Sequence, residues 1–140
     1  MICGLIVLLI IIGFFFIFNK KEKVATSTET EVKTEGSMGG ERYTTYSPEK
    51  VVEATGKILL FFHAPWCPYC RSLDKELNKE ISTIPENLLL LKTDYDTETA
   101  LKQKYGVTYQ HTFVQIDNKG NLITKWNGSE NLSQILSNIK

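Results

Sequence analysis

The stretch of sequence at residues 57–70 is Lys57-Ile58-Leu59-Leu60-Phe61-Phe62-His63-Ala64-Pro65-Trp66-Cys67-Pro68-Tyr69-Cys70. Its first part, residues 57–64, is a continuous apolar run of strand length, which is typical of a central strand covered on both faces. After this run the pattern changes, because Leu73 and Leu77 recur four residues apart, as on one face of a helix. We therefore predict a buried strand, a short turn, and an amphipathic helix that begins at or beside Cys67 and runs to about residue 81.

Elements of these two kinds alternate through residues 43–140. Short runs rich in β-branched and aromatic residues predict strands, and the amphipathic stretches between them, which begin at capping residues, predict helices. The expected order is β-α-β-α-β-α-β-β-α, and Asn118-Lys119-Gly120 marks a tight hairpin before the last strand. The sequence therefore predicts an α/β domain in which helices flank a mixed central sheet. The predicted strands are residues 43–46, 57–64, 88–94, 112–117 and 121–126; the predicted helices open at Ser47, Cys67, Thr97 and Asn131, with Gly56 and Gly106 ending the first and third.

The motif Trp66-Cys67-Pro68-Tyr69-Cys70 carries the chemistry. Cysteines three residues apart at a helix start lie within disulfide reach, and free backbone N–H groups of the first turn point at Cys67. These donors and the helix dipole favour a thiolate, so Cys67 is predicted to be the nucleophile. Cys70, one turn into the helix, is shielded and suited to resolving a mixed disulfide. Pro68 stiffens the turn, and Trp66 and Tyr69 are expected to form an apolar rim. We expect a solvated helix face at Arg71, Asp74, Lys75, Glu76, Lys79 and Glu80.

Residues 43–140 resemble the thioredoxin family. The most specific part of the resemblance is residues 64–70, and residues 92–96 and 104–107 look like the family's third-strand end and its approach to the fourth strand. The resemblance implies a thioredoxin-like three-layer fold and thiol–disulfide exchange with protein thiols and disulfides, served by a redox-recycling partner. It implies the same roles for Cys67 and Cys70, whose redox-active disulfide takes the place of any cofactor.

Two positions depart from the family pattern. The family usually carries a buried acid six residues before the first cysteine, where this chain has Phe61. Cys70 must therefore lose its proton by another route, through water or Lys92. The family's fourth strand begins with a cis-proline, where this chain has His111. A cis bond before a non-proline residue costs about 2.5–4 kcal/mol, so we expect a trans Gln110–His111 bond and a changed docking of substrate strands.

His111 is open to several interpretations. An imidazole beside the sulfurs could stabilise the Cys67 thiolate as a cation or act as a general base, and the alternative is a solvated residue at a strand start. A second hypothesis for the whole domain is a metal-binding module, in which Cys67, Cys70 and His111 bind copper, zinc or an iron–sulfur cluster, as in thioredoxin-fold copper chaperones. A zinc ribbon is disfavoured because the sequence has no second pair of ligands. A redox-inert adaptor is disfavoured because both cysteines are intact.

The N-terminal residues 1–18 are predicted to be a transmembrane anchor. Residues 2–18 are apolar throughout, and as a helix they would span roughly 25 Å, at the short end of what crosses a bilayer. A soluble amphipathic helix would show polar residues every third or fourth place. A cleaved signal peptide is disfavoured because no basic segment precedes the run. Residues 19–42 are predicted to be a flexible polar linker to the domain at 43–140.

Two arguments bear on the orientation of this predicted single-pass protein in the membrane, and they point in opposite directions. Lys20, Lys21 and Lys23 follow the anchor, and the positive-inside rule alone would place the domain in the cytoplasm. Disulfide chemistry belongs to the oxidising side of a membrane. We expect the domain on the extracytoplasmic side, because a tether there lets it serve exported proteins.

Composition excludes several other classes of protein. The 16 basic and 16 acidic side chains cancel, so the chain lacks the basic footprint of a nucleic-acid-binding protein. A hydrophobic share of 42% excludes wholesale disorder. Three cysteines are too few for a disulfide scaffold.

Overall fold

The computed structural model of the protein describes residues 41–140. The predicted anchor at residues 2–18 and almost all of the predicted linker at 19–42 lie outside the described residues. Among the helices of residues 41–140, none combines the length and the apolar character that crossing a bilayer requires.

A five-stranded mixed sheet forms the centre of the domain, in the strand order β1-β3-β2-β4-β5. Strands β1, β3 and β2 run parallel, whereas β4 pairs antiparallel with both β2 and β5. The predicted α/β fold with a mixed sheet flanked by helices is confirmed. The strands are β1 (Tyr43–Thr45), β2 (Lys57–His63), β3 (Leu88–Asp94), β4 (Thr112–Ile116) and β5 (Leu122–Asn127). The helices are α2 (Pro48–Glu53), α3 (Pro68–Lys79), α4 (Thr99–Tyr105) and α5 (Leu132–Asn138), with a 3-10 turn η1 at Ile81–Thr83.

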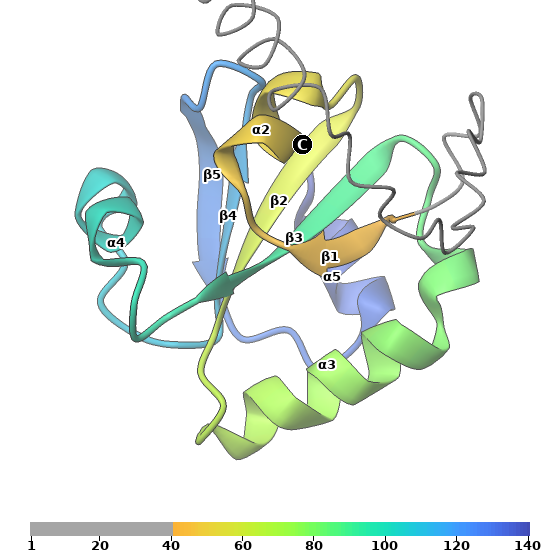
Figure 1. Ribbon diagram of the computed structural model, residues 1–140. Coiled ribbons are helices and arrows are strands. Elements are labelled where there is room, and N and C mark those ends of the chain that lie inside the picture. Colours follow the sequence, from red (N-terminus) through yellow and green to blue (C-terminus); the bar gives the residue numbers. More distant parts are fainter. Residues whose placement is uncertain (1–40) are drawn as a thin grey trace, which may run out of the picture. The chain divides into compact units, whose positions relative to one another are not determined.

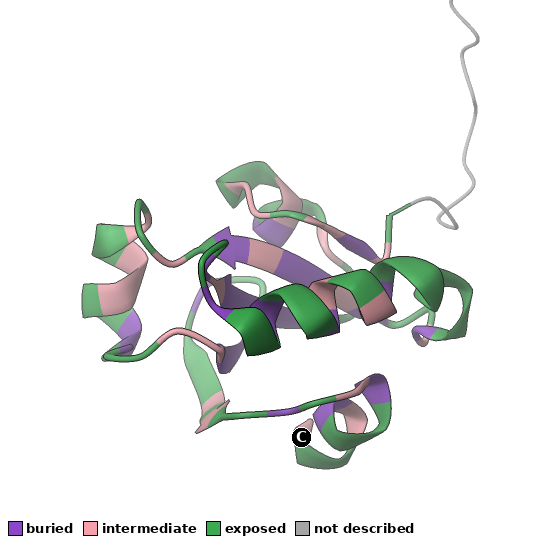
Figure 2. Ribbon diagram, turned by 90° about the horizontal axis from the view of Figure 1, so that it is seen from below, coloured by how far each residue is buried: buried purple, intermediate pink, exposed green. Residues whose placement is uncertain are grey.

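Helices cover both faces of the sheet (Figure 1). Successive side chains of β2 point to opposite faces, so Leu59 and Phe61 pack in one buried cluster with residues of α3 and α5. Leu60 and Phe62 belong to a second cluster that includes residues of α2 and α4. Figure 2 shows the buried strands between helices whose outward sides are exposed. Because β2 is buried on both faces, packing fixes the position of its carboxyl end relative to the rest of the sheet. The chain leads from this end into α3.

Two helix boundaries differ from the predicted ones. Helix α2 ends at Glu53, before Gly56 is reached. Helix α4 begins at Thr99, and Thr97 is not its cap. The Oδ1 atom of Asp94 accepts the backbone N–H of Thr97 at 2.9 Å, so a local turn at the end of β3 uses this residue before the helix starts. The predicted caps that the structure confirms are Ser47, Asn131 and Gly106.

Gly56 is required for the close approach of two chain segments. The backbone N–H of Lys57 donates to the carbonyl oxygen of Asn87 at 2.7 Å, at the point where β2 and β3 begin to pair. A Cβ atom on Gly56 would overlap this same carbonyl oxygen. The glycine therefore serves packing between the strands rather than the end of a helix.

We expect Gly56→Ala to lower the free energy of unfolding by about 1–3 kcal/mol, because the backbone of Asn87 must move to admit the new methyl group. Gly128→Asn is the control, since a Cβ at Gly128 meets nothing within 4 Å and asparagine tolerates its positive φ of 70°. Chemical denaturation of both variants measures the effect. Wild-type stability in Gly56→Ala would contradict the packing argument.

Candidate active site

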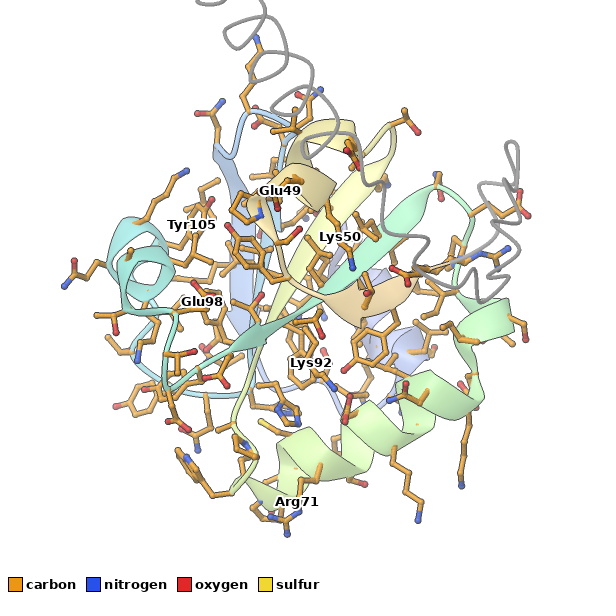
Figure 3. All side chains as sticks on the ribbon, viewed as in Figure 1. Glu49, Lys50, Arg71, Lys92, Glu98 and Tyr105 are labelled. Atoms are coloured by element: carbon orange, nitrogen blue, oxygen red, sulfur yellow. The ribbon has the colours of Figure 1, made fainter. Side chains whose placement is uncertain are left out.

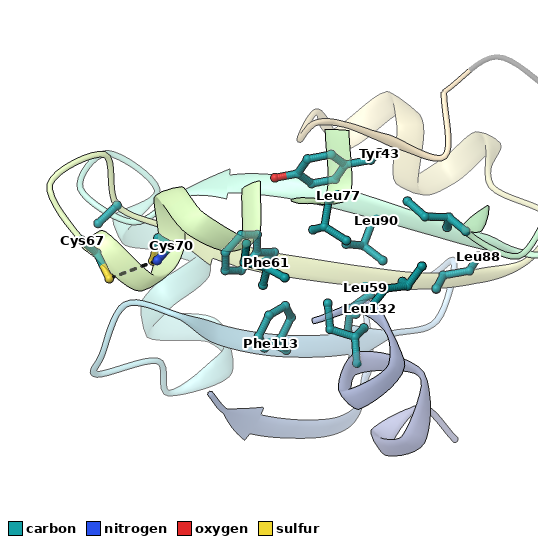
Figure 4. Packing of buried hydrophobic residues seen from close by; sticks show 14 residues of the cluster. Tyr43, Leu59, Phe61, Cys67, Cys70, Leu77, Leu88, Leu90, Phe113 and Leu132 are labelled. Carbon is teal, nitrogen blue, oxygen red and sulfur yellow. Dashed lines mark hydrogen bonds between the residues drawn. The ribbon is translucent and has the colours of Figure 1, made fainter. Parts of the chain in front are cut away.

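Cys67 caps the helix that follows the central strand. Strand β2 ends at His63, and α3 begins at Pro68 with Cys67 as its N-cap, as the sequence predicts. The Sγ atom of Cys67 accepts a hydrogen bond from the backbone N–H of Cys70 at 3.4 Å (Figure 4). The two sulfur atoms lie within 4.8 Å of each other, and both residues are free thiols. The motif thus presents two cysteines across the first turn of one helix.

The pKa values of the two thiols shift in opposite directions. Cys67 is 3% exposed and Cys70 is fully buried. Burial disfavours the Cys67 thiolate, but hydrogen bonds from the backbone N–H and thiol of Cys70 and from the backbone N–H of Tyr69 outweigh it, so the pKa of Cys67 falls below its ordinary value. Burial is the main cause that raises the pKa of the Cys70 thiol to about 12. Cys67 is therefore the cysteine that ionises first.

Exposed side chains surround Cys67. Trp66 is 55% exposed and Tyr69 is 68% exposed, and Pro68 between the cysteines is exposed as well. The Nε1 atom of Trp66 donates to the Oδ2 atom of Asp96 at 3.0 Å, which anchors the indole ring. Exposed aromatic side chains therefore come directly before and two residues after Cys67, which is itself almost buried.

His111 approaches the sulfurs from the start of β4. One of its ring nitrogens lies within 4.8 Å of the Sγ atoms of Cys67 and Cys70. All peptide bonds in residues 41–140 are trans, so the expected trans bond between Gln110 and His111 is confirmed. The φ angle of His111 is 59°, and no other non-glycine residue in this part of the chain has a positive φ. Such a backbone costs on the order of 1–3 kcal/mol, so neighbouring groups must hold it in place.

Hydrogen bonds hold His111 at three atoms. Its backbone N–H donates to the carbonyl oxygen of Phe62 at 2.8 Å, and its carbonyl oxygen accepts the N–H of Gly128 at 3.1 Å. Its Nε2 atom lies 2.9 Å from the carbonyl oxygen of Ser129. Because a carbonyl oxygen only accepts, Nε2 must carry a proton. Within residues 41–140 the Nδ1 atom is buried without a hydrogen-bond partner, so the neutral ring presents a free lone pair at Nδ1.

Phe61 and Phe113 pack against the histidine ring. The Phe61 ring meets His111 edge to face at a centroid distance of 5.5 Å, and Phe113 meets it at 5.7 Å in the same manner. The two phenylalanine rings stack on each other at 4.8 Å. The residue at the position of the family's buried acid thus contacts the residue at the position of the family's proline.

Lys92 lies between the sheet and α3 (Figure 3). Its Nζ atom is 3.2 Å from the Oδ1 atom of Asp74, and the hydroxyl of Tyr43 donates to the same oxygen. Burial alone would raise the pKa of Asp74, but the bonds from Tyr43 and Lys92 bring it below its ordinary value. The expectation that Asp74 belongs to a solvated helix face is wrong, because its side chain is only 24% exposed and contacts two strands.

Three residues of the site were not anticipated. The side chain of Gln110 is one of the polar neighbours that lower the pKa of the Cys67 thiol. Ser129 is fully buried and offers its carbonyl oxygen to the histidine ring. Glu130 borders a pocket of about 350 Å³ beside the motif. Gln110 was detectable from its place next to the unusual histidine, whereas no residue-type signal marks a backbone carbonyl. The pocket is lined by Tyr69, Ser72, His111 and Glu130.

Residues 42–140 match the family model described as Thioredoxin, which is well over half of the chain. The chain belongs to the thioredoxin family. Its thioredoxin domain is similar to the crystal structure of Trxlp from Edwardsiella tarda EIB202, at 25% identity and a TM-score of 0.56, covering 69% of this chain and 96% of that one. Mitochondrial thioredoxin 3 from Saccharomyces cerevisiae, in its oxidised form, is 28% identical with a TM-score of 0.52, covering 64% of this chain and 82% of that one.

Curated relatives include thioredoxins and protein disulfide-isomerases. Mitochondrial thioredoxin from Mus musculus is 28% identical over 92 residues, which are 66% of this chain and 55% of that protein. Protein disulfide-isomerase like 2-2 from Arabidopsis thaliana is 36% identical over 58 residues, 41% of this chain and 13% of that protein. The chain thus spans about half the length of the mitochondrial thioredoxin it matches. These similarities concern the thioredoxin domain.

We expect iodoacetamide at neutral pH to modify Cys67 and to spare Cys70. Alkylation follows the thiolate fraction, so the Cys67 rate should rise with pH and level off below the ordinary thiol pKa, whereas the Cys70 rate rises only toward pH 12. Site-resolved mass spectrometry of the reduced protein over a pH series measures both rates. Faster labelling of Cys70 at neutral pH would contradict the order of ionisation.

Proposed function

We propose that this protein is a thiol–disulfide oxidoreductase that exchanges disulfides with protein substrates, with Cys67 as nucleophile and Cys70 as resolving cysteine. One observation carries the proposal: Sγ of Cys67 caps α3 and accepts the N–H of Cys70 at 3.4 Å, while Cys70 is fully buried. The hydrogen bond favours the thiolate of the first cysteine, and burial favours the neutral thiol of the second. Membership of the thioredoxin family and the similarity to a protein disulfide-isomerase support the same activity.

The exchange takes two steps in the reducing direction. The Cys67 thiolate attacks one sulfur of a substrate disulfide, and the other substrate sulfur leaves as a thiolate and takes a proton from water. Cys70 then loses its proton, attacks Sγ of Cys67, and expels the second substrate sulfur. Two electrons pass to the substrate, the Cys67–Cys70 disulfide remains, and a dithiol partner must reduce it for the next cycle. The reverse steps oxidise a substrate dithiol, and the cysteine pair is the only redox group that either direction requires.

The proton of Cys70 needs an acceptor, because burial raises the pKa of this thiol to about 12. His111 meets the need, since a ring nitrogen lies within 4.8 Å of the sulfur and Nδ1 has no hydrogen-bond partner among residues 41–140. In this proposal Nδ1 accepts the proton as the Cys70 sulfur attacks. Lys92 supports the site indirectly, as the cationic partner of Asp74 one helical turn after Cys70. Its ammonium group, paired in this way, has no lone pair to accept a proton.

Substrate recognition falls to side chains rather than to the backbone of His111. The N–H of this residue already donates to the carbonyl oxygen of Phe62 and is therefore not free to pair with an extended substrate strand, and its carbonyl oxygen already accepts the N–H of Gly128. Trp66 and Tyr69 instead offer exposed aromatic surface beside Cys67. Aromatic side chains of this kind contribute much of the energy at protein interfaces. We therefore expect a preference for disulfides flanked by apolar residues.

We expect Cys67→Ser to abolish reduction of insulin disulfides, because serine cannot act as the attacking thiolate, and Cys70→Ser to accumulate a mixed disulfide between Cys67 and insulin. The insulin reduction assay and non-reducing electrophoresis measure the two effects. Cys3→Ser is the matched control and should reduce insulin at the wild-type rate, since Cys3 has no part in the proposal. A mixed disulfide that forms through Cys70 in the Cys67→Ser variant would reverse the two roles.

We also propose that residues 2–18 anchor the protein in a membrane and that the domain lies on the extracytoplasmic side. The support is the charge-free sequence of residues 2–18 and the polar segment 19–42 behind it. Disulfide exchange with exported proteins belongs to an oxidising compartment. The lysines that follow the anchor favour the opposite orientation, which makes the side of the membrane the quantity to measure.

We expect protease added to intact cells that express the full-length chain to release the domain by cutting within residues 24–40. The reason is that a polar segment outside the membrane is open to digestion, whereas the packed domain resists it. Immunoblotting of the released fragment measures the cut, and a cytoplasmic protein that stays intact is the control. Cleavage only after lysis would place the domain in the cytoplasm.

A further inference from the structure

We propose that the reduced domain binds one zinc ion through the Sγ atoms of Cys67 and Cys70 and the Nδ1 atom of His111. This site goes beyond disulfide exchange, because it needs no substrate. The ligand residues come from the start of α3 and from the residue before β4, and the two sulfur atoms and one ring nitrogen of His111 lie within 4.8 Å of one another. Ligand atoms of a tetrahedral zinc site lie about 3.8 Å apart, so the widest separation has to close by at most about 1 Å.

The hydrogen bond to Ser129 prepares His111 as a ligand. Its Nε2–H group donates to a backbone carbonyl at 2.9 Å, which leaves the lone pair on Nδ1. Histidines that bind metals almost always donate their other ring N–H in this way. Within the described residues Nδ1 is buried without a partner, and an unsatisfied buried polar atom costs about 1–3 kcal/mol. A bound cation would coordinate the lone pair of Nδ1. Otherwise this lone pair needs a hydrogen-bond donor.

The direction of this lone pair is held before any ion arrives. The backbone of His111 is anchored at its N–H and its carbonyl oxygen in a conformation with a φ of 59°. Phe61 and Phe113 each pack against the imidazole ring in an edge-to-face arrangement. The distances between ring centroids are 5.5 Å for Phe61 and 5.7 Å for Phe113. A ligand that cannot rotate loses little freedom on binding. The strained backbone is thereby explained, since it keeps the imidazole beside the two sulfurs.

The chemistry of the donor set favours zinc. Two thiolates and one neutral imidazole carry two negative charges, which a divalent cation neutralises in a largely buried place. Thiolate sulfur and imidazole nitrogen are the ligands that zinc prefers. In this proposal a water molecule takes the fourth position, and the ion enters from the pocket of about 350 Å³ that Tyr69 and His111 line.

Zinc binding and disulfide exchange exclude each other. Zn²⁺ displaces the proton of each thiol to solvent and bonds to both sulfurs, and no electron is transferred. A zinc-bound Cys67 cannot attack a substrate, and the Cys67–Cys70 disulfide has no thiolate left to bind zinc. The ion would therefore act as a reversible inhibitor of the reduced protein only.

The test uses the full-length chain, reduced and then freed of small thiols. Zn²⁺ is titrated in competition with a chromophoric chelator, and Co²⁺ serves as a spectroscopic substitute that reports thiolate ligands by its charge-transfer absorption. We expect one equivalent to bind, and His111→Asn to weaken binding at least about tenfold. Asparagine tolerates the positive φ but lacks the imidazole. His63→Asn is the matched control, since His63 is the other histidine of the chain, and it should bind like the wild type.

Each of three results would overturn the site. They are the absence of zinc binding by the reduced wild type, equal affinity in His111→Asn and the wild type, and equal binding by the oxidised protein. The comparison of reduced and oxidised wild type remains decisive even where a variant fails to fold. Insulin reduction by the same preparations in excess chelator reports on the oxidoreductase separately, so loss of zinc binding there leaves the proposed function standing.

Discussion

A single hydrogen bond, from the backbone N–H of Cys70 to Sγ of Cys67, joins the fold of this domain to its chemistry. It is the N-cap of α3, so the contact that starts the helix is also the one that favours the thiolate. The place of this cap depends on β2, whose residues 58–62 are fully buried. A shift of β2 by one residue would exchange its two buried faces. The packing of the central strand therefore determines where the sulfur of Cys67 lies.

The two departures from the family pattern form one structural unit. Phe61 is fully buried, stacks on Phe113 and meets His111 edge to face. With no acid there, the imidazole of His111 is the titratable side chain beside the two sulfurs. Lys92 on β3 lies opposite Phe61 of β2 in the strand register. Its ammonium group forms an ion pair with the carboxylate of Asp74 on α3.

Local patterns were sufficient to predict the element order and the helix start at Cys67, because hydrophobic periodicity and capping act over a few residues. The partners of Asp74 were predictable in part, since a residue four positions after the buried Cys70 shares its helix face. The conformation of His111 was not predictable. It depends on carbonyl and N–H groups that every residue carries, brought there by β2 and by the turn at Gly128. Tertiary pairing, not residue type, determines which backbone groups meet.

The lone pair of His111 Nδ1 connects the two chemistries proposed for the site, because it can accept a proton or bind a cation but not both. In the reduced domain the thiol of Cys70 and a zinc ion compete for the same atom and the same sulfurs. In the oxidised domain both sulfurs are joined, so two of the three ligands are lost and the remaining imidazole binds zinc weakly. Under this proposal, reduction of the disulfide would create the metal site, and oxidation would remove it. The orientation of one ring, held by Ser129 and two phenylalanines, is what would couple the proposed metal affinity to the redox state of the cysteine pair.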